Sequence, residues 1–314
     1  MNTISNRQVI CDVLLEKAKT DRIIMVLTSD SRGSASLTQF AKEFPEQFVE
    51  VGIAEQNIVG IAAGLASCGK KVFVASPASF LSTRSIEQIK VDVAYSQTNV
   101  KLIGISGGVS YGALGMTHHS VQDIAFVRSI PGIKVILPAD RHETANLVEA
   151  LLKEEDPVYV RIGRNPVPDV YESSNYDFQI GKAVTMHEGD DATIIATGEM
   201  VYAAVIGARL LKEQGINCRV LNMHTIKPLD EAAILKAAKE TKCIVTIEEH
   251  SIYGGLGGAV AELVAQQGSV PMRILGIPDQ PAIAGKSAEV FAHYGLTGAN
   301  LAETIKTLLA DLAR

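Results

Sequence analysis

The stretch EVGIAEQNIVGIAAGLASCG, residues 50–69, places a glutamate at the start of a run of small and aliphatic residues. Glu55 lies among Ile53, Ile58 and Val59, and the small residues behind it predict a helix that packs closely against a neighbour. A carboxylate is costly to bury unless another group pairs with it. The pattern therefore predicts a partner for Glu55. The alternative is that Glu55 only places a charge at a helix N-terminus.

Short apolar runs alternate with helical patterns on both sides of this stretch. The strand candidates of the first half are, in order, RIIMVLTSD, KVFVAS, VKLIGIS, KVILPA and PVYVRIG. Continuous apolar strands joined by helices predict a mostly parallel α/β sheet with helices on both faces. Ligands of such sheets lie beyond the carboxyl ends of the strands. The segments after these ends, such as the one that begins at Asp30, are therefore the candidate sites.

A segment rich in proline, serine and asparagine, RNPVPDVYESSNYDFQIGK, interrupts the alternation and is typical of a linker. The strand candidates DATIIATG, NCRVLNM, CIVTIEEH and MRILGI follow it, with helical patterns between them. We therefore expect two α/β domains, one over 1–170 and one over 181–314, joined by a linker at 171–180.

Composition excludes several classes of protein. The chain has 314 residues, of which 47% are hydrophobic and 20% charged, so it can bury two cores. Its net charge of −6 gives no basic footprint for nucleic acid. It shows neither a signal-peptide pattern nor an apolar run long enough to span a membrane. The cysteines form no metal-ligand or C-x-x-C spacing, which favours reduced thiols in the cytoplasm. They are Cys11, Cys68, Cys218 and Cys243.

Three of the predicted strand ends carry polar residues that suit a ligand site. Asp30 follows the first strand, where a helix cap or turn residue is as good an interpretation as a ligand contact. Arg161 and Arg164 end another strand, and two guanidinium groups there suit a phosphate or carboxylate. A glycine-rich loop from Ser106 ends in adjacent histidines, a spacing poor for a metal site.

In this order, several motifs resemble one family. The segments FVEVGIAEQNIVGIAAGLA, THHSVQDIAFVRSIPGIKVILPAD, GDDATIIATGEMV and HTIKPLDEAAIL are similar to the C-terminal half of transketolase, over essentially the whole chain. The resemblance implies a pyrimidine-binding domain over 1–170 and the transketolase C-terminal domain over 181–314. It also implies thiamine diphosphate as cofactor and transfer of a two-carbon ketol unit between sugar phosphates.

The resemblance gives Glu55 its partner. The family's glutamate in this motif faces N1′ of the cofactor's aminopyrimidine, and sharing a proton with that nitrogen satisfies the buried carboxyl. It implies that Asp30 lies beside the cofactor and that His118 hydrogen-bonds substrate oxygens. Arg164, and Arg7 as a second candidate, match groups that hold the sugar phosphate.

Three departures from the family motifs bear on the substrate and the cofactor contact. The family's GEDGPTH reads GALGMTH, so that Leu114 replaces an aspartate, and Ser106 replaces a histidine. Both changes predict a ketose outside the ordinary pentose-phosphate set. The family's stacking aromatic residue is absent in register, and Phe80 or Leu81 is expected to contact the pyrimidine instead.

The motif that holds the other end of the cofactor is missing from the sequence. Thiamine diphosphate needs Mg²⁺ held by a GDG motif and a later asparagine, and this sequence has no GDG. Mg²⁺ on a diphosphate requires oxygen ligands. We therefore expect a separate N-terminal transketolase subunit to supply them, in an α2β2 assembly that is active only when both chains are present.

Two other interpretations stay open at this point. A 2-oxoacid dehydrogenase E1 β-type subunit or a relative of deoxyxylulose-phosphate synthase shares the domain pair, and decarboxylation of a 2-oxoacid distinguishes its chemistry. A non-catalytic assembly or regulatory module is the second alternative. The presence of Glu55, His118 and Arg164 argues against it.

Overall fold

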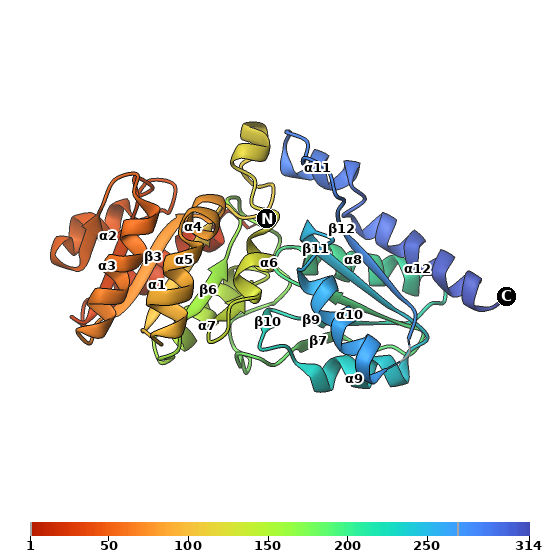
Figure 1. The fold of residues 1–314 in the computed structure, drawn as a ribbon. Coiled ribbons are helices and arrows are strands. Elements are labelled where there is room, and N and C mark those ends of the chain that lie inside the picture. The colour runs from red at the N-terminus through yellow and green to blue at the C-terminus, as the bar shows by residue number, and fades with distance from the viewer. Residues whose placement is uncertain (1, 269) are drawn as a thin grey trace.

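The chain folds around two β-sheets that lie side by side in a computed structural model, which describes residues 2–268 and 270–314 (Figure 1). Both sheets are mostly parallel, and helices cover both faces of each, as the sequence predicts. Within those two ranges, no helix is long and apolar enough to cross a bilayer.

The first sheet has seven strands in the order β10-β5-β6-β4-β3-β1-β2. All neighbouring strands in it are parallel except β10 and β5. The strands are β1 (Ile24–Thr28), β2 (Phe48–Glu50), β3 (Lys71–Pro77), β4 (Val100–Ile105), β5 (Lys134–Ile136), β6 (Val158–Arg161) and β10 (Thr225–Lys227). Because β6, β4, β3 and β1 are consecutive neighbours, the residues that follow them meet at one edge.

Helices bury both faces of this sheet because most positions of its longer strands are apolar and buried. In β1, Ile24 and Val26 face one cluster of side chains, and Met25 and Leu27 face the other. The first face packs against α1 (Asn6–Ala18), α2 (Thr38–Glu43) and α7 (Arg141–Leu151). The second packs against α3 (Glu55–Ser67), α4 (Ala78–Arg84), the π-helix η2 (Ile89–Tyr95) and α6 (Asp123–Arg128). Short segments η1 (Pro45–Gln47), α5 (Ile86–Gln88) and η3 (Gly112–Thr117) complete this part.

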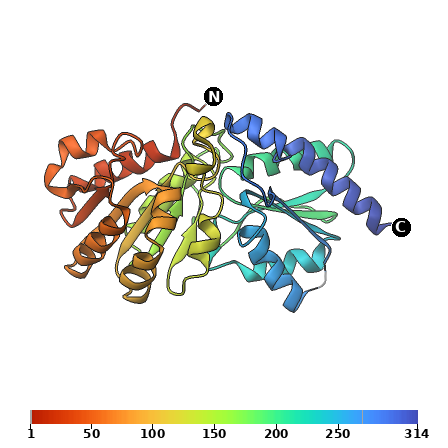
Figure 2. The same cartoon turned by 45° about the horizontal axis from the view of Figure 1, so that its top comes forward.

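The second sheet has five strands in the order β12-β11-β8-β9-β7, with β7 antiparallel at one edge. They are β7 (Val184–His187), β8 (Ala192–Ala196), β9 (Cys218–Asn222), β11 (Ile244–Ser251) and β12 (Met272–Ile277). Helices α8 (Met200–Lys212), α11 (Ser287–His293) and α12 (Gly298–Leu312) pack on one face. Helices α9 (Glu231–Glu240) and α10 (Leu256–Gln267) pack on the other. Figure 2 shows α12 running along the outer side of this part.

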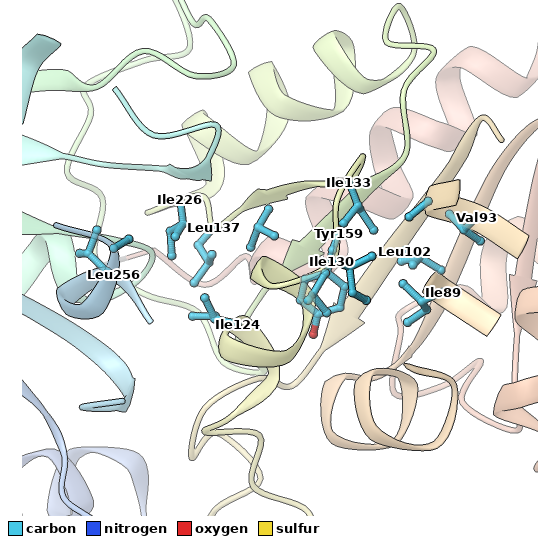
Figure 3. Close-up of a cluster of buried hydrophobic side chains, with 14 of the residues drawn as sticks. Ile89, Val93, Leu102, Ile124, Ile130, Ile133, Leu137, Tyr159, Ile226 and Leu256 are labelled. Carbon is cyan, nitrogen blue, oxygen red and sulfur yellow. The ribbon is translucent and has the colours of Figure 1, made fainter. Parts of the chain in front are cut away.

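The two sheets are tied together by a strand and by a shared core. Strand β10 follows β9 in the chain but pairs with β5 of the first sheet. One cluster of buried side chains runs from Ile89 and Tyr159 in the first part to Ile226 and Leu256 (Figure 3). A segment beyond the linker therefore completes the first sheet, and the boundaries at 170 and 180 stay a prediction.

The linker is held by two buried carboxylates at the start of α7. Asp140 caps this helix and accepts hydrogen bonds from the backbone amides of Val170 and Tyr171. Glu143 is fully buried and accepts from the hydroxyls of Tyr171 and Tyr176 and from the amide of Asn222. Burial raises the pKa of Glu143 from 4.5 to about 7, although its hydrogen bonds act in the opposite direction.

We expect the free energy of unfolding to decrease as the pH rises from about 5 to 8, in part because of Glu143. The pKa of this carboxyl is higher in the folded state than in the unfolded state. Its contribution to stability is therefore complete when the pH is below the unfolded-state pKa, and it is lost as the pH rises through the folded-state pKa. The contribution is ~1–3 kcal/mol. Urea unfolding at pH 5.5 and 8 measures the slope. Glu143→Gln should flatten the slope, whatever it does to the absolute stability. An unchanged slope would refute this pKa assignment.

Candidate active site

A side-chain hydrogen bond links the carboxyl ends of β1 and β3, at the sheet edge where the candidate residues lie. The hydroxyls of Ser29 and Ser76, one after β1 and one in β3, lie 2.7 Å apart. Asp30 has a left-handed backbone with φ of 51°, and its amide donates to a Glu50 carboxylate oxygen at 2.7 Å. Asp30 is not the N-cap of a described helix, and its side chain is exposed at this edge. Its position suits the predicted ligand contact, and its role stays a prediction.

Glu55 is the first residue of α3 and is only 5% exposed. Its partner within the chain is Arg84 at the end of α4, whose Nη1 lies 3.0 Å from a carboxylate oxygen. Because the Arg84 side chain is 46% exposed, this ion pair is weak and open to exchange. The close packing predicted for the whole run is found only in part: Ala62 and Ala63 are buried, whereas nothing lies within 4 Å of a Cβ placed at Gly64.

A row of side chains in contact runs from Glu55 across this edge of the sheet, through Arg84, Phe80, His118 and Tyr111. The guanidinium of Arg84 lies over the Phe80 ring, 4.1 Å from its centre. The Phe80 ring meets the His118 ring edge-on at 5.2 Å, and the Tyr111 ring meets His118 from another side, also at 5.2 Å. Leu81, the other candidate for a contact with the pyrimidine, is 0% exposed within the core. Of the two, only Phe80 is accessible to a ligand in this conformation.

Two arginines lie at the far end of this row. The Arg164 guanidinium lies over the Tyr111 ring at 5.3 Å, and Arg7 donates to the carbonyl of Ser34. Burial, and then repulsion by Arg164, lower the pKa of Arg7. Nε of Arg7 and Nη1 of Arg164 are buried without a hydrogen-bond partner among the described residues. Two neighbouring cations with unused donors can bind an anion such as a phosphate.

Arg161 does not join this pair, contrary to the interpretation of two arginines at one strand end. It is 4% exposed and donates to the carbonyl of Glu249 at 2.6 Å, on β11. A Glu249 carboxylate oxygen accepts from the amide of Val109 at 2.7 Å, which fastens the glycine-rich loop to the second sheet. Burial raises the pKa of Glu249 to about 7. A side chain at Gly108, where φ is 59°, would collide with Glu249.

The remaining two predicted site residues lie on the same loop. Ser106 is fully buried with φ of 54°, and its hydroxyl has no partner among the described residues. Leu114 is 54% exposed on η3.

Sequence reasoning missed Arg84, Tyr111 and Glu249. Arg84 follows Phe80 by one helical turn, a spacing that places both side chains on one helix face and could have indicated the first of them.

Residues 2–169 match the family described as "Transketolase, pyrimidine binding domain", and residues 181–301 match "Transketolase, C-terminal domain". The chain therefore belongs to the transketolase family, whose members depend on thiamine diphosphate, and it corresponds to the C-terminal half of the enzyme. This confirms the predicted family and fold class.

Two curated relatives of similar length are named as transketolase subunits. The chain is 54% identical to an apulose-4-phosphate transketolase subunit of Phocaeicola vulgatus, over 96% of this chain and 97% of that protein. It is 39% identical to a 6-deoxy-6-sulfo-D-fructose transketolase subunit of Clostridium, over 93% and 90%. The solved structure "Split gene transketolase, inactive beta4 tetramer" is 36% identical, with a TM-score of 0.89 over 98% and 99%. The prediction of a split transketolase subunit, a transferase, is confirmed.

The alternative of a deoxyxylulose-phosphate synthase relative fits less well. The chain is 37% identical to 1-deoxy-D-xylulose-5-phosphate synthase 1 of Geobacter sulfurreducens, but it spans only 47% of that protein.

The residues at this edge fit one end of the cofactor. Glu55 is a buried carboxylate, and its partner Arg84 lies over the accessible ring of Phe80. Such groups can hold a polar heterocycle. Among residues 2–268 and 270–314, no cluster of three His, Cys, Asp or Glu side chains could hold a metal ion.

Proposed function

We propose that the chain is the pyrimidine-binding subunit of a two-chain transketolase that acts on ketose phosphates outside the ordinary pentose-phosphate set. The position of Glu55 carries this proposal. Its carboxylate is buried, its described ion-pair partner is a half-exposed arginine, and it begins the row of side chains that ends at Arg7 and Arg164.

Each side chain of the row has a role in this proposal. Thiamine diphosphate, when bound, would supply a carbon nucleophile and an electron sink. Glu55 would share a proton with N1′ of the pyrimidine, and Phe80 would pack on that ring. His118 donates to the substrate oxygens near the carbonyl; its Nδ1 lies 3.0 Å from the Thr117 hydroxyl, which fixes the direction of the ring. Arg164 and Arg7 grip the phosphate.

The partner is an N-terminal transketolase subunit that supplies the Mg²⁺ and diphosphate ligands, in an α2β2 assembly in the cytoplasm. The exposed face of α3 at Gly64 supports a second chain there, because no described group of this chain packs against it. The related split-gene structure is an inactive tetramer of the β chain alone, which fits a requirement for both chains.

Among ketose phosphates, apulose 4-phosphate is the first candidate donor. The relative named for it shares 54% of its residues with this chain, against 39% for the relative named for a sulfonated fructose. Ser106 and Leu114 stand where the family has polar groups for substrate hydroxyls, so the site offers fewer partners to an ordinary pentose phosphate.

The test is an assay of ketol transfer with the chain alone, with the N-terminal subunit alone, and with the two mixed, each with thiamine diphosphate and Mg²⁺. We expect transfer only in the mixture and no release of CO₂ from 2-oxoacids. Decarboxylation of a 2-oxoacid by the mixture would favour the dehydrogenase or synthase alternative. A complex that forms but catalyses neither reaction would favour an assembly module.

Leu114→Asp should shift the preference of the mixed enzyme toward xylulose 5-phosphate. A carboxylate accepts a hydrogen bond from a substrate hydroxyl that leucine leaves unpaired, a difference of about 1–3 kcal/mol for one buried group. Because Leu114 is half-exposed in the single chain, this effect needs the closed complex with substrate. The measurement is the ratio of kcat/KM for xylulose 5-phosphate to that for apulose 4-phosphate. An unmoved ratio would assign Leu114 to loop packing.

A further inference from the structure

Tyr111 occupies a position in the site that the family motifs do not explain. It precedes η3 in the loop after β4, and its ring touches two groups of the proposed site at once. His118 lies against it at 5.2 Å, and the guanidinium of Arg164 lies over it at 5.3 Å. Its hydroxyl forms no hydrogen bond with the described residues, and the side chain is half-buried. The Tyr111 ring therefore contacts both the histidine and the arginine and is accessible to a ligand.

The loop holds Tyr111 in this place. Gly108 and Ser120 form an antiparallel bridge that closes its base, and Glu249 accepts from Val109 just before the tyrosine. A nitrogen of His119 lies 3.0 Å from the carbonyl of Gly112, directly after Tyr111. These hydrogen bonds fix the backbone on both sides of Tyr111, and the ring itself is held by its contacts with His118 and Arg164.

In the proposed binding mode, the carbon chain of a ketose phosphate lies beside this ring. Its carbonyl end lies at His118 and its phosphate at Arg164, so the carbons between them lie beside Tyr111. The imidazole and the guanidinium both contact this ring, at 5.2 and 5.3 Å from its centre, so the ring limits how far apart they can lie. Each further carbon lengthens an extended chain by about 1.2 Å, since three backbone bonds span roughly 3.3–3.6 Å. Extra carbons between fixed ends must bulge sideways, and the ring blocks that space.

We infer that Tyr111 is a specificity-determining residue that selects ketose phosphates with a short chain between the carbonyl and the phosphate. This inference rests on the proposed function. In apulose 4-phosphate, two bonds separate the carbonyl carbon from the carbon that carries the phosphate. The separation is three bonds in xylulose 5-phosphate, four in fructose 6-phosphate and five in sedoheptulose 7-phosphate. The preference of the enzyme should fall along this series.

The experiment measures kcat/KM for these four donors with the mixed two-chain enzyme. In Tyr111→Ala, the ratio for fructose 6-phosphate over apulose 4-phosphate should rise ~10-fold or more, the effect of about one methylene in a shaped pocket. Tyr111→Phe keeps the ring and should keep the ratio within about threefold. Tyr202→Ala, at a partly exposed position on α8, is the matched control and should leave the ratio unchanged.

The outcomes separate this inference from the proposed function. An active wild-type enzyme that accepts the longer donors as well as the shorter ones overturns the inference alone. So does a Tyr111→Ala enzyme that loses activity equally for all four donors, because the ring would then only position His118 and Arg164. Should Tyr111→Ala fail to fold, Tyr111→Leu must show the same direction of change, and an unchanged ratio there counts against the inference. A mixture inactive with every ketose contradicts the proposed function itself.

Discussion

Glu55→Gln should lower the turnover of the two-chain enzyme by about 10²–10⁴, the range typical of lost acid–base assistance. The amide keeps the size of the side chain but cannot share a proton with N1′ of the pyrimidine. The lower turnover should not come from unfolding of the variant. The ion pair that the substitution breaks involves a half-exposed Arg84, so we expect a stability change of no more than about 1 kcal/mol.

The measurement is kcat at saturating cofactor, partner and donor, with a melting curve of each variant. Glu16→Gln on the exposed side of α1 is the matched control, since its side chain is 69% exposed and pairs with Lys19 at the surface. Wild-type turnover in Glu55→Gln would sink the assignment. A low turnover accompanied by a lost melting transition would trace the effect to folding.

Arg164→Ala should raise KM for phosphorylated donors about 10- to 100-fold and should change kcat far less. A charge-assisted hydrogen bond of this kind is worth about 1.5–3 kcal/mol. The guanidinium grips a group remote from the reacting carbons, so its binding is nearly the same in the ground and transition states. Its Nη1 is buried and has no partner among the described residues, so in this chain the group is ready for an anion.

Steady-state kinetics with a phosphorylated ketose separate KM from kcat. Arg209→Ala, at an exposed position on α8, is the matched control and should change neither constant. A variant of Arg164 that lost turnover at saturation while KM stayed constant would contradict the phosphate role. Equal effects at Arg164 and Arg209 would point to net charge rather than to a site.

The sequence was informative wherever a strand forms a mostly apolar run. The runs that became β1, β3, β4 and β6 are buried on both faces, so composition alone indicates them. Three short strands were missed. β2 and β10 have three residues each, and β7 alternates between half-buried and exposed positions at a sheet edge. Such segments form strands because a partner strand is present, and their own residues do not show it.

For the site, the sequence predicted residues but not their neighbours. Glu55, His118 and Arg164 were indicated by motifs, and the structure places them along one row. Arg161 was grouped with Arg164, but the two residues point to different places, because one contacts Glu249 and the other lies over Tyr111. Such a difference depends on contacts with a distant part of the chain, which spacing along one strand cannot predict.

The most direct test of the central claim is the binding of thiamine diphosphate, measured by calorimetry with Mg²⁺ present and absent. The chain alone, the N-terminal subunit alone and the two mixed are titrated in turn. We predict tight, Mg²⁺-dependent binding in the mixture, weakened in Glu55→Gln, and little or no binding to this chain alone. Tight, Mg²⁺-dependent binding to this chain without a partner would contradict the account, because a complete cofactor site would then lie within one chain.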